Sequence, residues 1–125
     1  MATIISGVDF ISLPSQDLDR AADFYEHVVG LQRSKAWGRE NPLGIEFENG
    51  TVTIALMDVG RLGIPFAPHN APIAFHVEDF EAARAQLEER GVTFDTETID
   101  SGVCFQAYFR DPDGNSIGIH HRYAA

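Results

Sequence analysis

The chain has 125 residues, of which 44% are hydrophobic, and this is enough for one packed domain or for two half-domains that share a core. Its formal net charge of −10 disfavours nucleic acid and anionic membranes as partners and favours a cationic ligand, although the same charge also serves solubility. There is no apolar run long enough for a transmembrane helix and no signal-peptide pattern, and the single cysteine, Cys104, excludes an internal disulfide. We therefore expect a cytoplasmic protein.

The first half of the chain predicts one strand, one helix and three further strands. Segment 10–31 begins with a short alternating strand, and Asp17 then suits a helix N-cap because its carboxylate accepts free backbone N–H groups. The helix is expected to run for about ten residues and to end at Gly30. Strand-like stretches follow at 31–37, 43–49 and 51–59, and the Asn49-Gly50 pair predicts a tight hairpin between the last two.

The second half repeats this order after a linker rich in breakers at 61–71. Segment 72–92 matches segment 10–31 at an offset of 62 residues (79 minus 17), with Asp79 at the N-cap and Gly91 at the end of the helix. Strands are expected at 92–99, 103–110 and 115–122. The sequence thus predicts a single domain, 1–125, built from a first βαβββ module at 4–60 and a second at 72–123.

This duplicated plan, with DLDRAADFYEHVVGL near its start and DPDGN near its end, resembles the vicinal oxygen chelate superfamily. That group includes glyoxalase I, extradiol dioxygenases, fosfomycin-modifying enzymes and bleomycin resistance proteins. The resemblance covers nearly the whole chain and implies an α+β fold in which two βαβββ modules curl their sheets around a shared cleft. Metal-dependent members place a His on the first strand of a module and a Glu or His on its last strand, and these hold a divalent ion with open positions.

The four positions that match those ligands carry no ligating side chain here. They are Phe10 and Ala55 in the first module and Pro72 and Gly118 in the second. The usual metal site is therefore predicted to be absent, and no cofactor is expected, although a divalent metal on relocated ligands stays open.

Strand alternation predicts which side chains line the cleft. The ligand-binding candidates are Phe10, Ser12, Trp37, Phe47, Met57, Phe66, His76, Gln106, Tyr108 and His120. For the aromatic members, core packing is an equally valid interpretation. Cys104 is interpreted as a buried thiol, because nothing local would lower its pKa.

Two histidines, His76 and His120, are the candidates for catalysis, since imidazole titrates near neutral pH. Strands 72–77 and 115–121 are expected to be antiparallel neighbours. That arrangement would place the two histidines at opposite ends of the pair, too far apart to share one ion, and would leave His69 in the linker as an alternative partner of His120.

The favoured function is metal-independent binding of a small cationic or aromatic compound in the cleft, as in the bleomycin resistance branch of the family. The alternative is an enzyme of the lyase or dioxygenase type that uses the cavity histidines or relocated metal ligands. Relatives of this length are usually dimers, so we expect a homodimer that binds a small molecule and contacts neither nucleic acid nor membrane.

Overall fold

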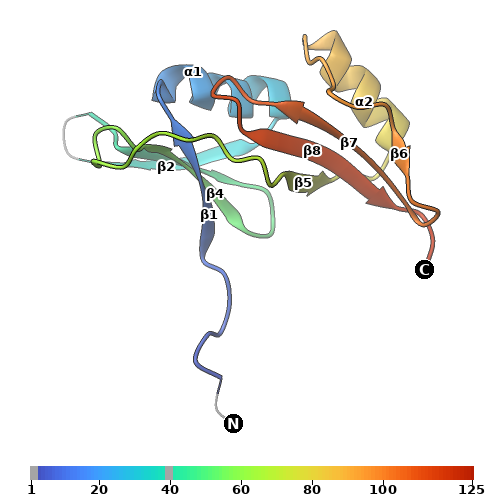
Figure 1. Cartoon of the computed structure of the whole chain (residues 1–125), viewed down its shortest axis with the longest axis horizontal. Helices are drawn as coiled ribbons and strands as arrows, with labels where there is room; N and C mark the ends of the chain where they lie inside the picture. The colour runs from blue at the N-terminus through green and yellow to red at the C-terminus, as the bar shows by residue number, and fades with distance from the viewer. Residues whose placement is uncertain (1–2, 39–40) are drawn as a thin grey trace.

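Two four-stranded sheets, each covered on one face by a helix, make up the structure, a computed structural model that describes residues 3–38 and 41–125 (Figure 1). The first sheet has the order β1-β4-β3-β2 and the second β5-β8-β7-β6. The elements of the first module are β1 Phe10–Ser15, α1 Leu18–Asp23, the π-helix η1 Phe24–Val29, β2 Gln32–Trp37, β3 Gly44–Glu48 and β4 Thr53–Asp58. Those of the second are β5 Ile73–His76, α2 Phe80–Glu89, β6 Ile99–Asp100, β7 Cys104–Arg110 and β8 Ser116–Arg122.

The predicted α+β fold of two βαβββ modules is confirmed. Among the described residues, no helix is long and apolar enough to cross a membrane.

Both modules pair their first and last strands in the same way. β1 runs parallel to β4 with Ser12 opposite Ala55, and β5 runs parallel to β8 with Ala74 opposite Gly118. Ser12 and Ala74 differ by the predicted offset of 62 (74 minus 12), so Ala55 and Gly118 are equivalent positions of the two modules.

The expectation that segments 72–77 and 115–121 are antiparallel is wrong. β7 lies between β6 and β8 and is antiparallel to both, and β5 returns to the far edge of β8 in the parallel sense. His76 is consequently paired with His120 rather than separated from it.

The helix boundaries follow the predicted signals. The carboxylates of Asp17 and Asp79 accept the backbone N–H groups of Arg20 and Ala82, each at 3.1 Å. The first helix widens into the π-helix η1, where the N–H groups of Gly30 and Leu31 both donate to the carbonyl of Tyr25. Gly30 at its end has a φ of 89°, a left-handed conformation that costs a glycine little.

Segment 92–99 was predicted as a strand, but only Ile99 and Asp100 pair as β6. The N–H of Asp95 donates to the carbonyl of Tyr108, while the N–H of Tyr108 donates to the side-chain hydroxyl of Thr96. A side chain thus replaces a backbone acceptor, and this breaks the ladder. The hairpin at Asn49 is confirmed, although its loop spans the four residues between β3 and β4.

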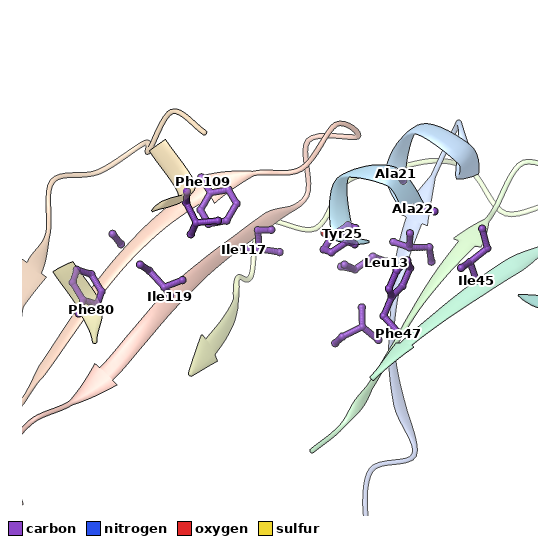
Figure 2. Packing of buried hydrophobic residues seen from close by; sticks show 14 residues of the cluster. Leu13, Ala21, Ala22, Tyr25, Ile45, Phe47, Phe80, Phe109, Ile117 and Ile119 are labelled. Atoms are coloured by element: carbon purple, nitrogen blue, oxygen red, sulfur yellow. The ribbon is translucent and has the colours of Figure 1, made fainter. Parts of the chain in front are cut away.

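The buried side chains gather on the helix-covered face of each sheet (Figure 2). Leu13 and Phe47 lie under α1, and Phe109, Ile117 and Ile119 lie in the second module. The strand alternation predicted for β1, β5, β7 and β8 agrees with this packing, because every second residue of each strand belongs to the core or packs against it: Ile11, Leu13, Ile73, Phe75, Phe105, Phe109, Ile117 and Ile119.

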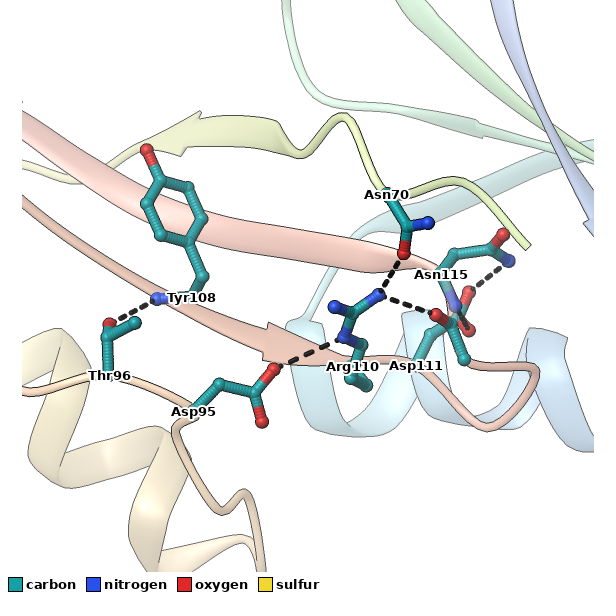
Figure 3. A network of polar contacts seen from close by, with 8 residues as sticks. Asn70, Asp95, Thr96, Tyr108, Arg110, Asp111 and Asn115 are labelled. Carbon is teal, nitrogen blue, oxygen red and sulfur yellow. Dashed lines mark hydrogen bonds and ion pairs between the residues drawn. The ribbon is translucent and has the colours of Figure 1, made fainter.

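A polar cluster in the 111–115 turn joins the two modules. The buried carboxylate of Asp111 accepts the hydroxyl of Tyr25 at 2.7 Å and the side-chain amide of Asn115 at 2.9 Å. The same amide donates to the carbonyl of Pro14 at 3.0 Å, and the side-chain oxygen of Asn115 accepts the backbone N–H of His69 at 2.8 Å. Figure 3 shows the contact of Asp111 with Asn115. We call this set the Asp111 cluster.

We predict that Tyr25→Phe lowers the free energy of unfolding by about 1–2 kcal/mol, because a buried carboxylate oxygen loses one of its donors. Burial raises the pKa of the Tyr25 phenol well above its usual value and the Asp111 charge adds to this, so the donor stays protonated at any working pH. Tyr123→Phe is the control, since its hydroxyl donates to the exposed Asp100. Urea unfolding at one fixed protein concentration measures both, and equal losses would contradict a special role for the cluster.

Candidate functional site

The face of each sheet that points away from its helix, here called the open face, carries most of the predicted site residues. On the first module it bears Phe10, Ser12, Trp37 and Met57, together with Glu46, Glu48 and Ala55. On the second it bears His76, Gln106, Tyr108 and His120, together with Ala74, Cys104 and Gly118. Phe10 is 54% exposed, so the face is accessible in the single chain.

Two predicted site residues do not lie on the open face. Phe47 has no exposed surface, because it alternates with Glu46 and Glu48 and therefore points into the core under α1. Phe66 is half-buried on the segment that joins the modules. Phe47 therefore fits the core-packing interpretation, and Phe66 lies away from the open face.

Gly118 leaves room for an aromatic ring. Tyr108 stands opposite it on β7, and a Cβ built on Gly118 would overlap that ring and lie 2.5 Å from the carbonyl oxygen of Ala107. The Tyr108 hydroxyl donates to the side-chain oxygen of Gln106. In Figure 3 the ring stands on the side of the sheet away from α2. The place of the family's glutamate is thus covered by the Tyr108 ring.

In the first module, too, an aromatic ring covers a glycine on the neighbouring strand. Trp37 on β2 is paired with Gly44 on β3, and a Cβ at Gly44 would overlap the indole. Glu46 and Glu48 extend along the same face of β3, and the Glu48 carboxylate accepts hydroxyls from Ser34 at 3.0 Å and Thr53 at 2.7 Å. Glu46 lies two residues along β3 from Gly44 and is paired with Lys35 on β2, and Glu48 lies two residues further on. An aromatic platform with a carboxylate on the next strand suits a flat cation.

The candidate histidines are neighbours on the second module. His76 and His120 are paired across β5 and β8, and both belong to the open face. His76 Nε2 lies 3.0 Å from a carboxylate oxygen of Glu78, and this hydrogen bond lowers the pKa of the Glu78 carboxyl. His69 is exposed on the linker, where its carbonyl accepts the N–H of Ser116, and it belongs to the Asp111 cluster rather than to the open face.

A groove of about 770 Å³ runs between the modules and was not predicted. Ile11 and Ile54 line it from the first module, and Phe75 and Leu87 line it from the second. It borders the outer edge of β5, which has no strand partner among the described residues. No pattern in the sequence predicts this groove, because its lining comes from segments far apart along the chain.

Known proteins resemble this chain along nearly its whole length. Residues 7–119 match the family model described as the Glyoxalase/Bleomycin resistance protein/Dioxygenase superfamily. The chain is 28% identical over 123 residues to the glutathione transferase FosA of Serratia marcescens, which covers 94% of this chain and 82% of that protein.

Two solved structures illustrate the likeness of fold. TnmS3, an antibiotic binding protein from Streptomyces sp. CB03234, superposes with a TM-score of 0.80 at 28% identity, covering 97% of this chain and 99% of that one. A lactoylglutathione lyase from Agrobacterium tumefaciens superposes with a TM-score of 0.77 at 20% identity over 93% of each chain, and this likeness shows the fold alone. Both binding proteins and enzymes therefore stand among the proteins similar to this chain.

We predict that Gly118→Ala lowers the free energy of unfolding by about 1–3 kcal/mol, because the added methyl group overlaps the Tyr108 ring. Gly7→Ala is the matched control, since no atom lies within 4 Å of a Cβ built there. Tyr108→Ala in the Gly118→Ala background should recover part of the loss and leave the part due to the Ala107 carbonyl. Additive effects in this double-mutant cycle, measured by urea unfolding, would show that the ring does not cover Gly118.

Proposed function

This chain belongs to the Glyoxalase/Bleomycin resistance protein/Dioxygenase superfamily, and we propose that it binds a small cationic, aromatic compound on its open face without the chelated metal of its metal-dependent relatives. One observation carries the proposal. The positions matching the family's ligands hold Phe10, Ala55, Pro72 and Gly118, and the Tyr108 ring covers the last of them. A side chain that is absent cannot ligate, and the ring leaves no room to restore it.

The ligand class follows from what the open face offers. Trp37 supplies a flat aromatic surface, and Glu46 and Glu48 lie one strand away from it. The formal net charge of −10 raises the local concentration of cations around the whole molecule. The similarity to TnmS3, an antibiotic binding protein, supports a binding function. On this proposal the protein sequesters its ligand in the cytoplasm.

We also propose that the chain forms a homodimer in which the segment before β1 of one copy binds the groove of the other. Three apolar residues before β1 are open to solvent, with exposures of 98% for Ile4, 75% for Ile5 and 68% for Val8. This segment projects away from the rest of the molecule (Figure 1). An extended apolar arm fits the groove beside the free edge of β5, where it can pair with that edge.

The pairing of the two histidines favours an enzyme as the second candidate. His76 lies beside His120, and Glu78 orients its ring from 3.0 Å, an arrangement that can transfer a proton to or from a bound ligand. The similarity to the glutathione transferase FosA agrees with this alternative. Loss of a discovered activity on replacing His76 and His120 together, with ligand binding retained, would favour it over simple binding.

We predict that 10-methylacridinium quenches the fluorescence of Trp37, the single tryptophan, in a saturable way and that neutral acridine binds more weakly. Glu46→Gln should weaken 10-methylacridinium binding about 3–10-fold, because one carboxylate beside the indole is lost. Glu89→Gln on the exposed end of α2 is the control, since it changes the net charge equally. Equal affinities for the cation and the neutral compound would contradict the proposed ligand class.

We predict that the chain sediments as a dimer and that Ile5→Asp with Val8→Asp raises the dissociation constant at least tenfold, because two buried contacts of the arm become charged. Ile64→Asp is the matched control, because Ile64 is 51% exposed on the linker. Analytical ultracentrifugation over a concentration series makes the comparison. A wild-type chain that sediments as a monomer would contradict the proposed homodimer but not the proposed binding on the open face.

A further inference from the structure

Three side chains with metal-binding atoms converge where β5 ends beside β8. His76 is the last residue of β5, Glu78 follows two positions later, and His121 belongs to β8. One ligand atom from each lies within 4.8 Å of the other two. Across residues 3–38 and 41–125, no other set of three His, Cys, Asp or Glu side chains meets this condition.

The hydrogen bonds of this cluster already orient the nitrogen atoms. His121 Nδ1 lies 2.9 Å from the carbonyl oxygen of Val77. A carbonyl oxygen only accepts, so Nδ1 carries the hydrogen and donates it, and His121 Nε2 keeps a free lone pair. Histidines that bind metals are commonly held in this way by a backbone carbonyl on the other ring nitrogen.

The spacing of His76 and Glu78 is close to what a small divalent ion requires. His76 Nε2 and a Glu78 carboxylate oxygen are 3.0 Å apart, and ligands about 2.0–2.2 Å from a tetrahedral ion lie roughly 3.3–3.6 Å from one another. The ligand atom of His121 lies within 4.8 Å of both. The His76 and His121 rings are inclined by 38°, with their centroids 6.1 Å apart. The side chains of His76 and Glu78 are 64% and 89% exposed, so both can turn toward an ion without unpacking the core.

We propose that His76, Glu78 and His121 form a Zn²⁺ site with three protein ligands and one open coordination position. Two imidazoles and one carboxylate are a donor set that suits zinc, and three protein ligands leave a position for water or for a ligand atom. His76 lies four residues beyond Pro72, which directly precedes β5, or about 13 Å along a strand, and the site is therefore distinct from the family's chelate position. It does not depend on the proposed binding of an aromatic cation.

Calorimetric titration of the untagged chain with ZnCl₂, followed by desalting and elemental mass spectrometry, tests this site. One Zn²⁺ per chain is expected, and Glu78→Gln and His121→Ala should each weaken binding about 10–100-fold. His27→Ala is the matched control, because His27 has a similarly exposed side chain, 65%, and lies 3.0 Å from a carboxylate oxygen of Glu26 without belonging to such a triplet. The Glu78 side chain lies on the surface, so a loss of Zn²⁺ affinity in Glu78→Gln does not arise from disturbed packing.

Substitution with Co²⁺ gives a second readout, since a tetrahedral Co²⁺ site absorbs visible light far more strongly than hexa-aqua Co²⁺. The intense absorption should appear with the wild-type chain and with His27→Ala, and should vanish with His121→Ala. Less than one retained Zn²⁺ per chain, or an equal loss of affinity with His27→Ala, would overturn the proposed site. Neither result bears on binding of 10-methylacridinium at Trp37.

Discussion

The buried carboxylate of Asp111 is the interaction on which the arrangement of the two modules depends. Burying an ionised group is costly unless hydrogen bonds replace its water. Here Tyr25 from the first module and Asn115 from the same turn donate to one oxygen, and the backbone N–H groups of Asp113 and Asn115 donate to the other. No buried side-chain polar atom of the described residues lacks a partner.

The Asp111 cluster also holds neighbouring segments of both modules in place. Asn115 ties the turn to Pro14 at the end of β1, and Arg20 on α1 donates to the carbonyl of Pro112 in the same turn. The linker is held as well, because Asn115 accepts the N–H of His69. The turn of the second module is thereby fixed against the first.

The open face and the proposed Zn²⁺ site are two separate candidate binding sites on the chain. Trp37 lies over Gly44 and Tyr108 lies over Gly118, so each glycine leaves room for an aromatic ring on the open face, and Gly118 is also one of the positions that match the family's metal ligands. The nitrogen and carboxylate donors of His76, Glu78 and His121 lie instead at the end of β5. His76 connects the two places, because its neighbour His120 belongs to the open face.

The sequence by itself determined the order of the modules, the capping of both helices by Asp17 and Asp79, and the faces of the strands. These are local properties, since a cap depends on three neighbouring residues and alternation on the next residue along. The absence of ligating side chains at the family's positions was also readable from the sequence. Only the tertiary structure decided that β5 and β8 are parallel, that Tyr108 covers Gly118, and that Val77 orients His121. Each of these depends on which distant segment lies alongside, and a local pattern does not encode that choice.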